Sequence, residues 1–372
     1  MSRPQQPPGN TARPAWSFRV ATAFGIPIRI HFTFLFFLAW VTISGSSSDG
    51  FSLAILLVAI FACVLLHELG HALVAKHFGV ETTDITLYPI GGIAMLDGRP
   101  KPRQEFWIAL AGPAVNVALA IVLALCVYVF EGGFSQFAGG LEKATLLDAL
   151  LIANIGLTLF NLIPAFPMDG GRVLRAALAQ AMPEAKATQI AGGIGQGLAI
   201  LIGLAGLLMQ QGFVLLLIAF FVFVGASQEI STTVTRSFLY GHTIADAMQT
   251  RFRTILSGDS LDKAAAMLLD GAQHDFPVMN GDEVLGVLTR NSIVRGLSTD
   301  GPTAYVAGMM QREYKTAALD SPLEAAIEMF PHADSTPILV FQDEVLVGML
   351  TLENLGEFVM LEHAKSQSGG NK

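Results

Sequence analysis

Long apolar runs alternate with short polar segments over the first two thirds of the chain. A helix needs about 20 apolar residues to cross a bilayer, so this pattern predicts about six membrane-spanning helices. Their approximate ranges are 27–45, 51–77, 106–130, 147–164, 190–209 and 213–235. The first run follows a long polar flank, and no clear small-residue cleavage site comes after it. It is therefore not expected to be a cleavable signal peptide.

The composition agrees with a membrane protein. Hydrophobic residues make up 52% of the chain and charged residues only 14%, against about 25% charged residues in ordinary soluble domains. These values exclude a disordered chain and a simple soluble enzyme. The two cysteines, Cys63 and Cys126, each lie inside an apolar run, which excludes a disulfide scaffold. A net charge of −8 argues against nucleic acid as a partner.

Charge divides the chain near Arg236. Residues 1–236 hold 13 Lys and Arg against 12 Asp and Glu, a net of +1, whereas residues 237–372 hold 9 against 18, a net of −9. The pattern predicts a membrane domain over 17–236, followed by an acidic soluble module. Residues 1–16 and 364–372 are polar, and we expect both to be disordered tails.

The basic residues predict the orientation of the helices, because cytoplasmic loops are enriched in Lys and Arg. The N-terminal tail and every second loop carry these residues: Arg3, Arg13, Arg19, Arg99, Lys101, Arg103, Arg172, Arg175, Lys186 and Arg236. The opposite loops hold Asp49, Glu131, Glu142 and only Lys143. Six spans with both termini in the cytoplasm satisfy all of these loops. The pattern suits the plasma membrane of a bacterial-type cell.

The second apolar run contains the motif His-Glu-x-x-His at 67–71. Four residues advance a helix by about 400°, so His67 and His71 share one face, one turn apart. Two imidazoles in this arrangement can bind one zinc ion, and Glu68 beside them can activate a metal-bound water. Three ionisable residues inside a membrane span are costly and indicate a function.

A zinc site of this kind needs a third protein ligand, and the sequence offers two candidates. His77 has the spacing of a longer soluble motif, but Val74 replaces the glycine that would turn the chain away from the helix. Asp169 follows two prolines that break the fourth run near its predicted cytoplasmic end. Asp169 could alternatively cap a short helix over 170–181.

Three motifs together resemble the site-2 protease family of intramembrane zinc metalloproteases. They are HELGH at 67–71, GPAVN at 112–116 and NLIPAFPMDGG at 161–171, and the resemblance covers roughly residues 20–235. It implies that His67, His71 and Asp169 bind one zinc ion and that Glu68 is the general base. Met168 stands where the family often has leucine.

Two asparagines accompany these motifs. Asn161 lies about two helical turns before Asp169, where its amide could donate to the developing oxyanion of the peptide carbonyl. The alternative is a hydrogen bond between helices, which intramembrane asparagine often makes. Asn116, one turn after Gly112, is expected to tie helices together or to orient a loop.

The segment 86–96 contains two strand-like stretches around Gly91-Gly92, which predicts a hairpin. An exposed edge there could pair with an unwound substrate segment by strand addition. This matters because a helical substrate hides its peptide carbonyls in its own hydrogen bonds. The resemblance implies that the hairpin is embedded in the membrane. The alternative is a packed loop without a catalytic role.

The acidic module is a tandem repeat with an offset of 62 residues. Two segments recur at this offset: Met248–Thr254 in Met310–Thr316, and Ser260–Ala265 in Pro322–Ala326, where Leu261 corresponds to Leu323. A third segment, Asp282–Thr289, recurs as Asp343–Thr351 with one additional residue. The repeat resembles a pair of cystathionine-β-synthase (CBS) domains over 240–300 and 301–363. Such pairs are α/β modules that usually bind adenine nucleotides and regulate an attached protein.

The resemblance indicates a candidate nucleotide site in each repeat. Thr289 and Thr351 fit the hydroxyl residue that follows the second strand. The family typically has an aspartate three residues later for the ribose, whereas this chain has Ser292 and Asn354. A pairing module without a ligand remains an alternative. In either case we expect a homodimer formed through this module.

The predicted fold is therefore a multi-pass α-helical membrane protein with a membrane-embedded β-hairpin and a soluble α/β tandem CBS module. The predicted function is regulated intramembrane proteolysis of single-pass membrane proteins in the lipid bilayer, with CBS modulation. The alternatives are a CBS-gated ion transporter or channel, in which the histidines and Asp169 form an ion path, and an inert relative that binds client proteins. The intact Glu68 argues against the inert relative.

Overall fold

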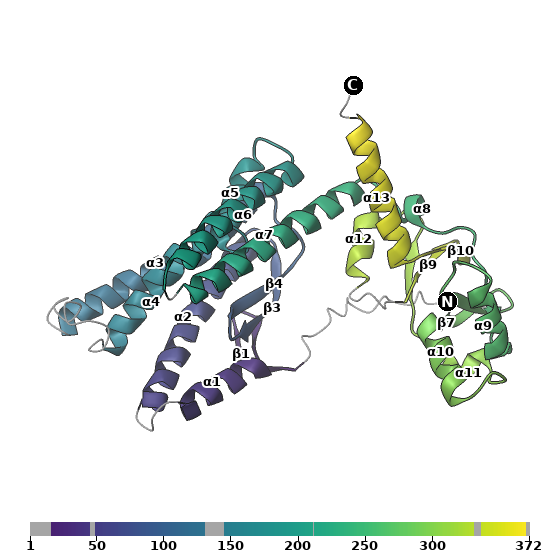
Figure 1. Ribbon diagram of the computed structural model, residues 1–372, viewed down its shortest axis with the longest axis horizontal. Helices are drawn as coiled ribbons and strands as arrows, with labels where there is room; N and C mark the ends of the chain where they lie inside the picture. The colour runs from purple at the N-terminus through teal and green to yellow at the C-terminus, as the bar shows by residue number, and fades with distance from the viewer. Residues whose placement is uncertain (1–15, 45–48, 131–144, 211, 331–335, 370–372) are drawn as a thin grey trace. The chain divides into compact units, whose positions relative to one another are not determined.

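The chain forms two compact units, Met1–Thr233 and Val234–Lys372. The computed structural model describes residues 16–44, 49–130, 145–210, 212–330 and 336–369. The predicted tail over 1–16 lies outside the described residues apart from Trp16. Figure 1 shows the helices and the sheet of the first unit and the smaller α/β elements of the second.

Four helices of the first unit are long and apolar enough to cross a membrane. They are α2 (Asp49–His77), α3 (Pro102–Phe130), α6 (Glu184–Leu208) and α7 (Phe213–Leu239). Two further predicted spans correspond to shorter apolar helices, α1 (Phe32–Ser44, 13 residues) and α4 (Leu146–Asn161, 16 residues). The short helix α5 (Asp169–Leu178) lies between α4 and α6. Large apolar side chains on these helices are exposed, as contact with lipid requires, among them Leu125 and Leu207.

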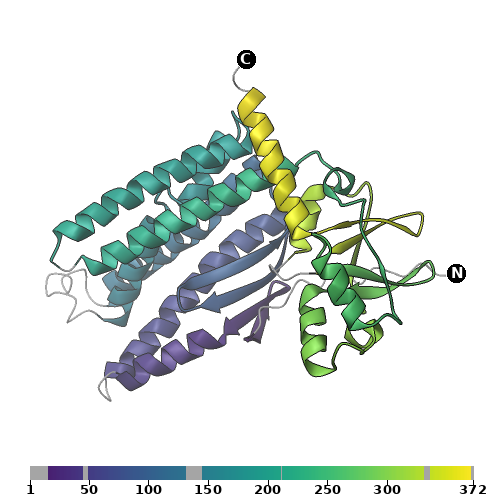
Figure 2. The same cartoon turned by 45° about the vertical axis from the view of Figure 1, so that its right-hand side comes forward.

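A four-stranded sheet accompanies the helices, with the strand order β1-β2-β3-β4. Its strands are β1 (Ser17–Ala23), β2 (Ile26–His31), β3 (Glu81–Tyr88) and β4 (Gly91–Asp97). The pairs β1/β2 and β3/β4 are antiparallel, and β2/β3 is parallel. The predicted hairpin around Gly91-Gly92 is the β3/β4 pair, and β4 forms one edge of the sheet. Figure 2 shows the sheet beside α2.

The predicted start of the first span is wrong by about five residues. Residues 27–31 belong to β2, and the helix begins only at Phe32. The reason is the alternation in Ile26–His31, where Ile26 and Ile28 are buried. Ile26 packs with Leu69 and Ala72 of α2 and with Ile85 of β3. A period of two residues is the pattern of a strand and not of a helix.

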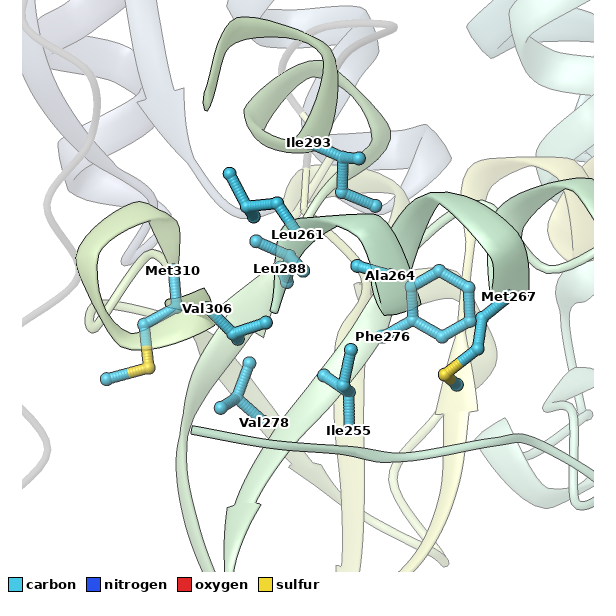
Figure 3. Close-up of a cluster of buried hydrophobic side chains, with 10 residues drawn as sticks. All are labelled: Ile255, Leu261, Ala264, Met267, Phe276, Val278, Leu288, Ile293, Val306 and Met310. Carbon is cyan, nitrogen blue, oxygen red and sulfur yellow. The ribbon is translucent and has the colours of Figure 1, made fainter. Parts of the chain in front are cut away.

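The second unit contains two similar three-stranded sheets. The first sheet has the order β5-β6-β7 and consists of β5 (Ile255–Leu256), β6 (Phe276–Asn280) and β7 (Glu283–Leu288). The second has the order β10-β9-β8 and consists of β8 (Lys315–Ala318), β9 (Ile338–Gln342) and β10 (Val345–Leu350). The helices of the unit are α8 (Ile244–Ala247), α9 (Leu261–Leu269), α10 (Arg290–Thr299), α11 (Val306–Met309), α12 (Leu323–Glu328) and α13 (Leu352–Gly369). Figure 3 shows the buried core of the first half, in which Phe276, Val278 and Leu288 from the sheet meet Leu261 and Ala264 from α9.

The two halves are joined by matched contacts that keep the offset of 62 residues. Gln249 bridges to Met349, and Gln311, its counterpart, bridges to Val287. A glycine lies close to each bridge. A Cβ atom on Gly286 would lie 2.4 Å from the Gln311 carbonyl oxygen, and a Cβ atom on Gly348 would lie 3.2 Å from the Gln249 carbonyl oxygen. The repeat seen in the sequence is therefore a twofold arrangement of equivalent backbone contacts within this unit.

The C-terminal segment differs from the prediction. Helix α13 continues to Gly369, so most of the expected tail over 364–372 is helical, while 370–372 lie outside the described residues. Local interactions support the extra turn. Lys365 Nζ lies 2.5 Å from Glu362 Oε1, and the Ser366 hydroxyl donates to the His363 carbonyl oxygen. Polarity alone did not prevent a helix because Lys and Gln have good helix propensity.

Candidate metal centre and active site

The motif at 67–71 lies on α2, and both of its histidines are buried. His67 and His71 occupy successive turns, with Nε2 atoms 3.0 Å apart and rings inclined at 82°. The geometry follows from the spacing of four residues within one uninterrupted helix. The two nitrogen atoms therefore face a common point.

Asp169, the first residue of α5, reaches the same point from another part of the chain. Its Oδ2 atom lies 3.1 Å from the Nε2 atom of His67 and 3.1 Å from that of His71. Among the described residues, these three form a buried group whose atoms could hold a metal ion. His77 is exposed at the end of α2 and is not part of this group.

Two glycines after Asp169 allow α5 to begin there. A Cβ on Gly170 would lie 2.3 Å from the Ile163 carbonyl oxygen, and one on Gly171 would lie 2.6 Å from the Phe166 backbone nitrogen. The loop that follows α4 thus folds directly against the first turn of α5. Side chains at either position would push the helix, and Asp169 with it, away from the histidines.

Helix α3 orients His71 and makes room for the metal ligands. The Nδ1–H group of His71 donates a 2.6 Å hydrogen bond to the Ile108 carbonyl oxygen. This bond fixes the tautomer and leaves the Nε2 lone pair free for a metal. One turn later, a Cβ on Gly112 would lie 2.2 Å from Nε2 of His71 and 2.5 Å from Nε2 of His67. Only glycine fits there.

The donor set and its spacing fit zinc. Two imidazole nitrogens and one carboxylate oxygen are the ligands of a catalytic zinc site, which keeps its fourth position open. Tetrahedral zinc with bonds of about 2.0–2.1 Å separates its ligand atoms by about 3.3 Å. The observed separations of 3.0–3.1 Å are close to this value.

Glu68 lies beside this group, next to the edge strand of the sheet. Its side chain is partly buried, and a Cβ on Gly92 in β4 would lie 2.5 Å from its Cγ atom. The glycine pair was predicted only as a turn signal. The structure adds that Gly92 lets the backbone of β4 pass directly over the Glu68 side chain.

The two asparagines have different surroundings. Asn161 is half-buried at the last position of α4, immediately before the loop that leads to Asp169. Asn116 is fully buried in α3, and neither atom of its amide has a hydrogen-bond partner among the described residues. Within that part of the chain no hydrogen bond of Asn116 ties helices together or orients a loop, and the role of this residue stays a prediction.

In the second unit, the four predicted nucleotide residues form two equivalent helix caps. The Thr289 hydroxyl oxygen accepts from the Ser292 backbone N–H at 3.2 Å, and the Thr351 hydroxyl oxygen accepts from that of Asn354 at 3.1 Å. Thr289 and Ser292 are buried. These residues thus begin α10 and α13 in the same way.

Comparisons with known proteins agree with this site. The profile of peptidase family M50 matches residues 55–147 and 142–202. A zinc metalloprotease of Methanocaldococcus jannaschii is 35% identical over 273 residues, which cover 73% of this chain and 78% of that protein. The chain belongs to peptidase family M50. This is the site-2 protease family, and membership favours a membrane metallopeptidase over a transporter or channel.

A further relative matches over both units, and other matches cover less of the chain. A Synechocystis protein that bears the name of a zinc metalloprotease is 30% identical over 359 residues. The match covers 90% of this chain and 93% of that protein. A solved site-2 protease of M. jannaschii is 42% identical and covers 58% of this chain and 95% of that chain, with a TM-score of 0.44. The CBS domain profile matches residues 244–299, within the first half of the second unit.

Three features of the M50 site have no clear signal in the sequence. The Ile108 carbonyl group carries no side-chain signal, and the contact of Gly92 with Glu68 joins segments that are distant in sequence. Arg175 was assigned to a cytoplasmic loop, whereas it is buried among carboxylates of two other helices. Gly112 had a partial signal, because a Gly-Pro pair inside an apolar run suggests close helix packing.

Proposed function

We propose that this M50 protein is an intramembrane zinc metalloendopeptidase that hydrolyses peptide bonds of membrane-spanning substrates. The observation that carries the proposal is the buried group of His67, His71 and Asp169 with Glu68 beside it, in a unit of long apolar helices. Each of these residue types is costly in such surroundings unless it is used.

The proposed site divides the chemistry among four residues and the metal. His67, His71 and Asp169 would hold zinc, which when bound lowers the pKa of water and polarises a carbonyl group. Glu68 takes the proton of the attacking water and delivers it to the leaving nitrogen. The Asn161 amide donates a hydrogen bond to the carbonyl oxygen as it gains negative charge.

We propose that the substrate binds as an extended strand along β4. This strand forms an edge of the sheet, and its residue Gly92 lies against Glu68. Strand addition would satisfy the backbone groups of an unwound substrate and bring its carbonyls past the base. The substrates would be single-pass membrane proteins, because their spans can enter laterally from the bilayer.

Cross-linking tests this binding mode. We place a cysteine at Ile93, which is exposed in β4, in a protein that also carries Glu68→Gln and Cys126→Ser. Single cysteines are then placed at successive positions around the cleavage site of a membrane protein that the wild type cuts. We expect the strongest disulfide at one substrate position, weaker ones two residues to either side and little at the positions between, because strand side chains alternate and a disulfide needs close Cβ atoms. Cross-links repeating every three to four positions, as in a helix, would contradict strand addition.

The topology remains part of the proposal. Six spans would include α1 and α4 with the four long helices, both termini would be cytoplasmic, and the membrane would be the plasma membrane of a bacterial-type cell. The distribution of Lys and Arg supports this arrangement.

We further propose that the second unit modulates proteolysis by binding an adenine nucleotide and by pairing into a homodimer. The matched caps at Thr289–Ser292 and Thr351–Asn354 support an equivalent site in each half. The Thr hydroxyls would contact the ribose, although Ser292 and Asn354 replace the usual aspartate.

A matched pair of variants tests the nucleotide site in the full-length protein. Thr289→Ala and Ser260→Ala each remove one helix cap, because the Ser260 hydroxyl accepts from the Lys263 backbone N–H in the same way. Each should lower the free energy of unfolding by about 1 kcal/mol. Only Thr289→Ala should weaken ATP or AMP binding in calorimetry. An equal loss of affinity in both variants would speak against a ribose contact at Thr289.

A further inference from the structure

Helix α5 carries a second buried charged residue besides Asp169. Arg175 is 8% exposed, and its guanidinium donates to two carboxylates from different helices. Nη2 contacts Glu105 on α3, and Nη1 contacts Glu229 on α7. The guanidinium carbon also lies 5.1 Å from the centre of the Phe166 ring, in the loop that leads to α5.

The geometry of this cluster depends on the guanidinium group. Its planar fork can bind two carboxylates at once, which a lysine ammonium on a flexible stem does less precisely. One cation faces two anions, so removal of the arginine would take this counter-ion away from Glu105 and Glu229 in partly buried surroundings. Buried charges of this kind are costly to separate from their partners.

The cluster connects the helices that carry the metal ligands. Arg175 lies six residues after Asp169, which is about 9 Å along the helix axis. Glu105 lies three residues, or about one turn, before Ile108, whose carbonyl oxygen holds His71. Helix α3 therefore orients His71 through Ile108 and is bonded to α5 through Glu105.

We propose that Arg175, held by Glu105 and Glu229, is a positioning residue that sets the place of Asp169 relative to His67 and His71. The proposal rests on the zinc site proposed above. Asp169 is the only ligand of the group outside α2, so its distance from the histidines depends on where α5 lies. The Arg175–Glu105 bond fixes α5 against the same helix that fixes His71.

The test measures metal binding by the full-length protein in detergent. Zinc affinity is obtained by competition with a chelator, and the visible spectrum of the Co²⁺-substituted protein reports the ligand geometry, because tetrahedral Co²⁺ absorbs more strongly than octahedral Co²⁺. The variants are Arg175→Gln, Arg175→Lys, Glu105→Gln and Glu229→Gln. Arg103→Gln is the matched control, because it removes an exposed arginine from the start of α3.

We expect Arg175→Gln to raise the zinc Kd by about 10- to 100-fold, as is typical when a residue that supports a metal ligand is lost. The absorption of its Co²⁺-substituted form should weaken. Arg175→Lys should restore part of the zinc affinity and part of the Co²⁺ absorption. Glu105→Gln should raise the Kd more than Glu229→Gln, because only Glu105 joins α5 to the helix that holds His71. Arg103→Gln should bind both metals as the wild type does.

Two results would overturn the proposal. The first is a wild-type Kd and Co²⁺ spectrum in Arg175→Gln. If that variant does not fold, a wild-type Kd and Co²⁺ spectrum in Glu105→Gln have the same meaning, because that variant changes the contact that joins α5 to α3. A His67→Ala variant separates this failure from that of the zinc site. If His67→Ala loses zinc while Arg175→Gln retains it, only the positioning role is wrong; if the wild type binds no zinc, the site itself is wrong.

Discussion

Replacement of Glu68 by glutamine is expected to lower the rate of peptide hydrolysis by about 10²- to 10⁴-fold, the usual contribution of a general base. Glutamine keeps nearly the same shape beside Gly92 but cannot take a proton from water. The zinc content should stay at the wild-type level, because Glu68 is not one of the three grouped metal ligands. The measurement is cleavage of a single-pass membrane protein, with zinc determined on the same preparation.

An exposed glutamate provides the control for this prediction. Glu81 lies at the exposed start of β3, so Glu81→Gln makes the same chemical change away from the metal group. It should cleave at the wild-type rate. Full activity in Glu68→Gln would show that another group moves the proton. Loss of zinc in that variant would show that Glu68 acts as a ligand.

The second large effect is expected from a single methyl group. In Gly112→Ala the new Cβ would lie 2.2 Å from Nε2 of His71 and 2.5 Å from Nε2 of His67, so both rings must move. The variant should lose most of its zinc, and its rate of peptide hydrolysis should fall by at least about 100-fold, because displacements of about 1 Å in a catalytic site have effects of this size. All of the ligand residues remain present.

Gly193 in α6 is the matched control, because a Cβ there would meet nothing within 4 Å. Gly193→Ala should retain zinc and activity and gain up to about 1 kcal/mol of stability from helix propensity. Wild-type zinc binding by Gly112→Ala would mean that α3 does not pack against the histidines as described.

Much of the candidate site could be predicted because part of it is local. His67 and His71 are four residues apart on one helix, so their geometry follows from helical periodicity. Asp169 is 98 residues from His71, and no spacing rule brings them together. Its place was predicted from the resemblance to the site-2 proteases and from the prolines before it, while His77, the local alternative, is exposed.

Contacts that depend on the backbone or on distant helices could not be predicted. The Ile108 carbonyl group orients His71, yet any residue at that position has the same carbonyl. Arg175 follows the DGG motif like an ordinary loop charge, and only the packing of α3 and α7 shows its two carboxylate partners. The alternation over 26–31 was hidden by the apolar residues that follow it, so the strand was included in a helix.

The second unit was predicted well because its pattern is repeated. The offset of 62 residues recurs in the bridges at Gln249 and Gln311 and in the caps at Thr289 and Thr351. The short strands β5 and β8, which begin each sheet, were not predicted. They pair in parallel with β6 and β9 over only two and four residue pairs, too few for a clear alternation.

The proposed metal centre is tested most directly by the zinc content of the purified wild type and of Asp169→Ala, measured under metal-replete conditions. We expect about one zinc per chain in the wild type and a large loss in the variant, because an aspartate from α5 completes a site built on two histidines of α2. Retention of zinc by Asp169→Ala, or its absence from the wild type, would contradict the proposed metal centre.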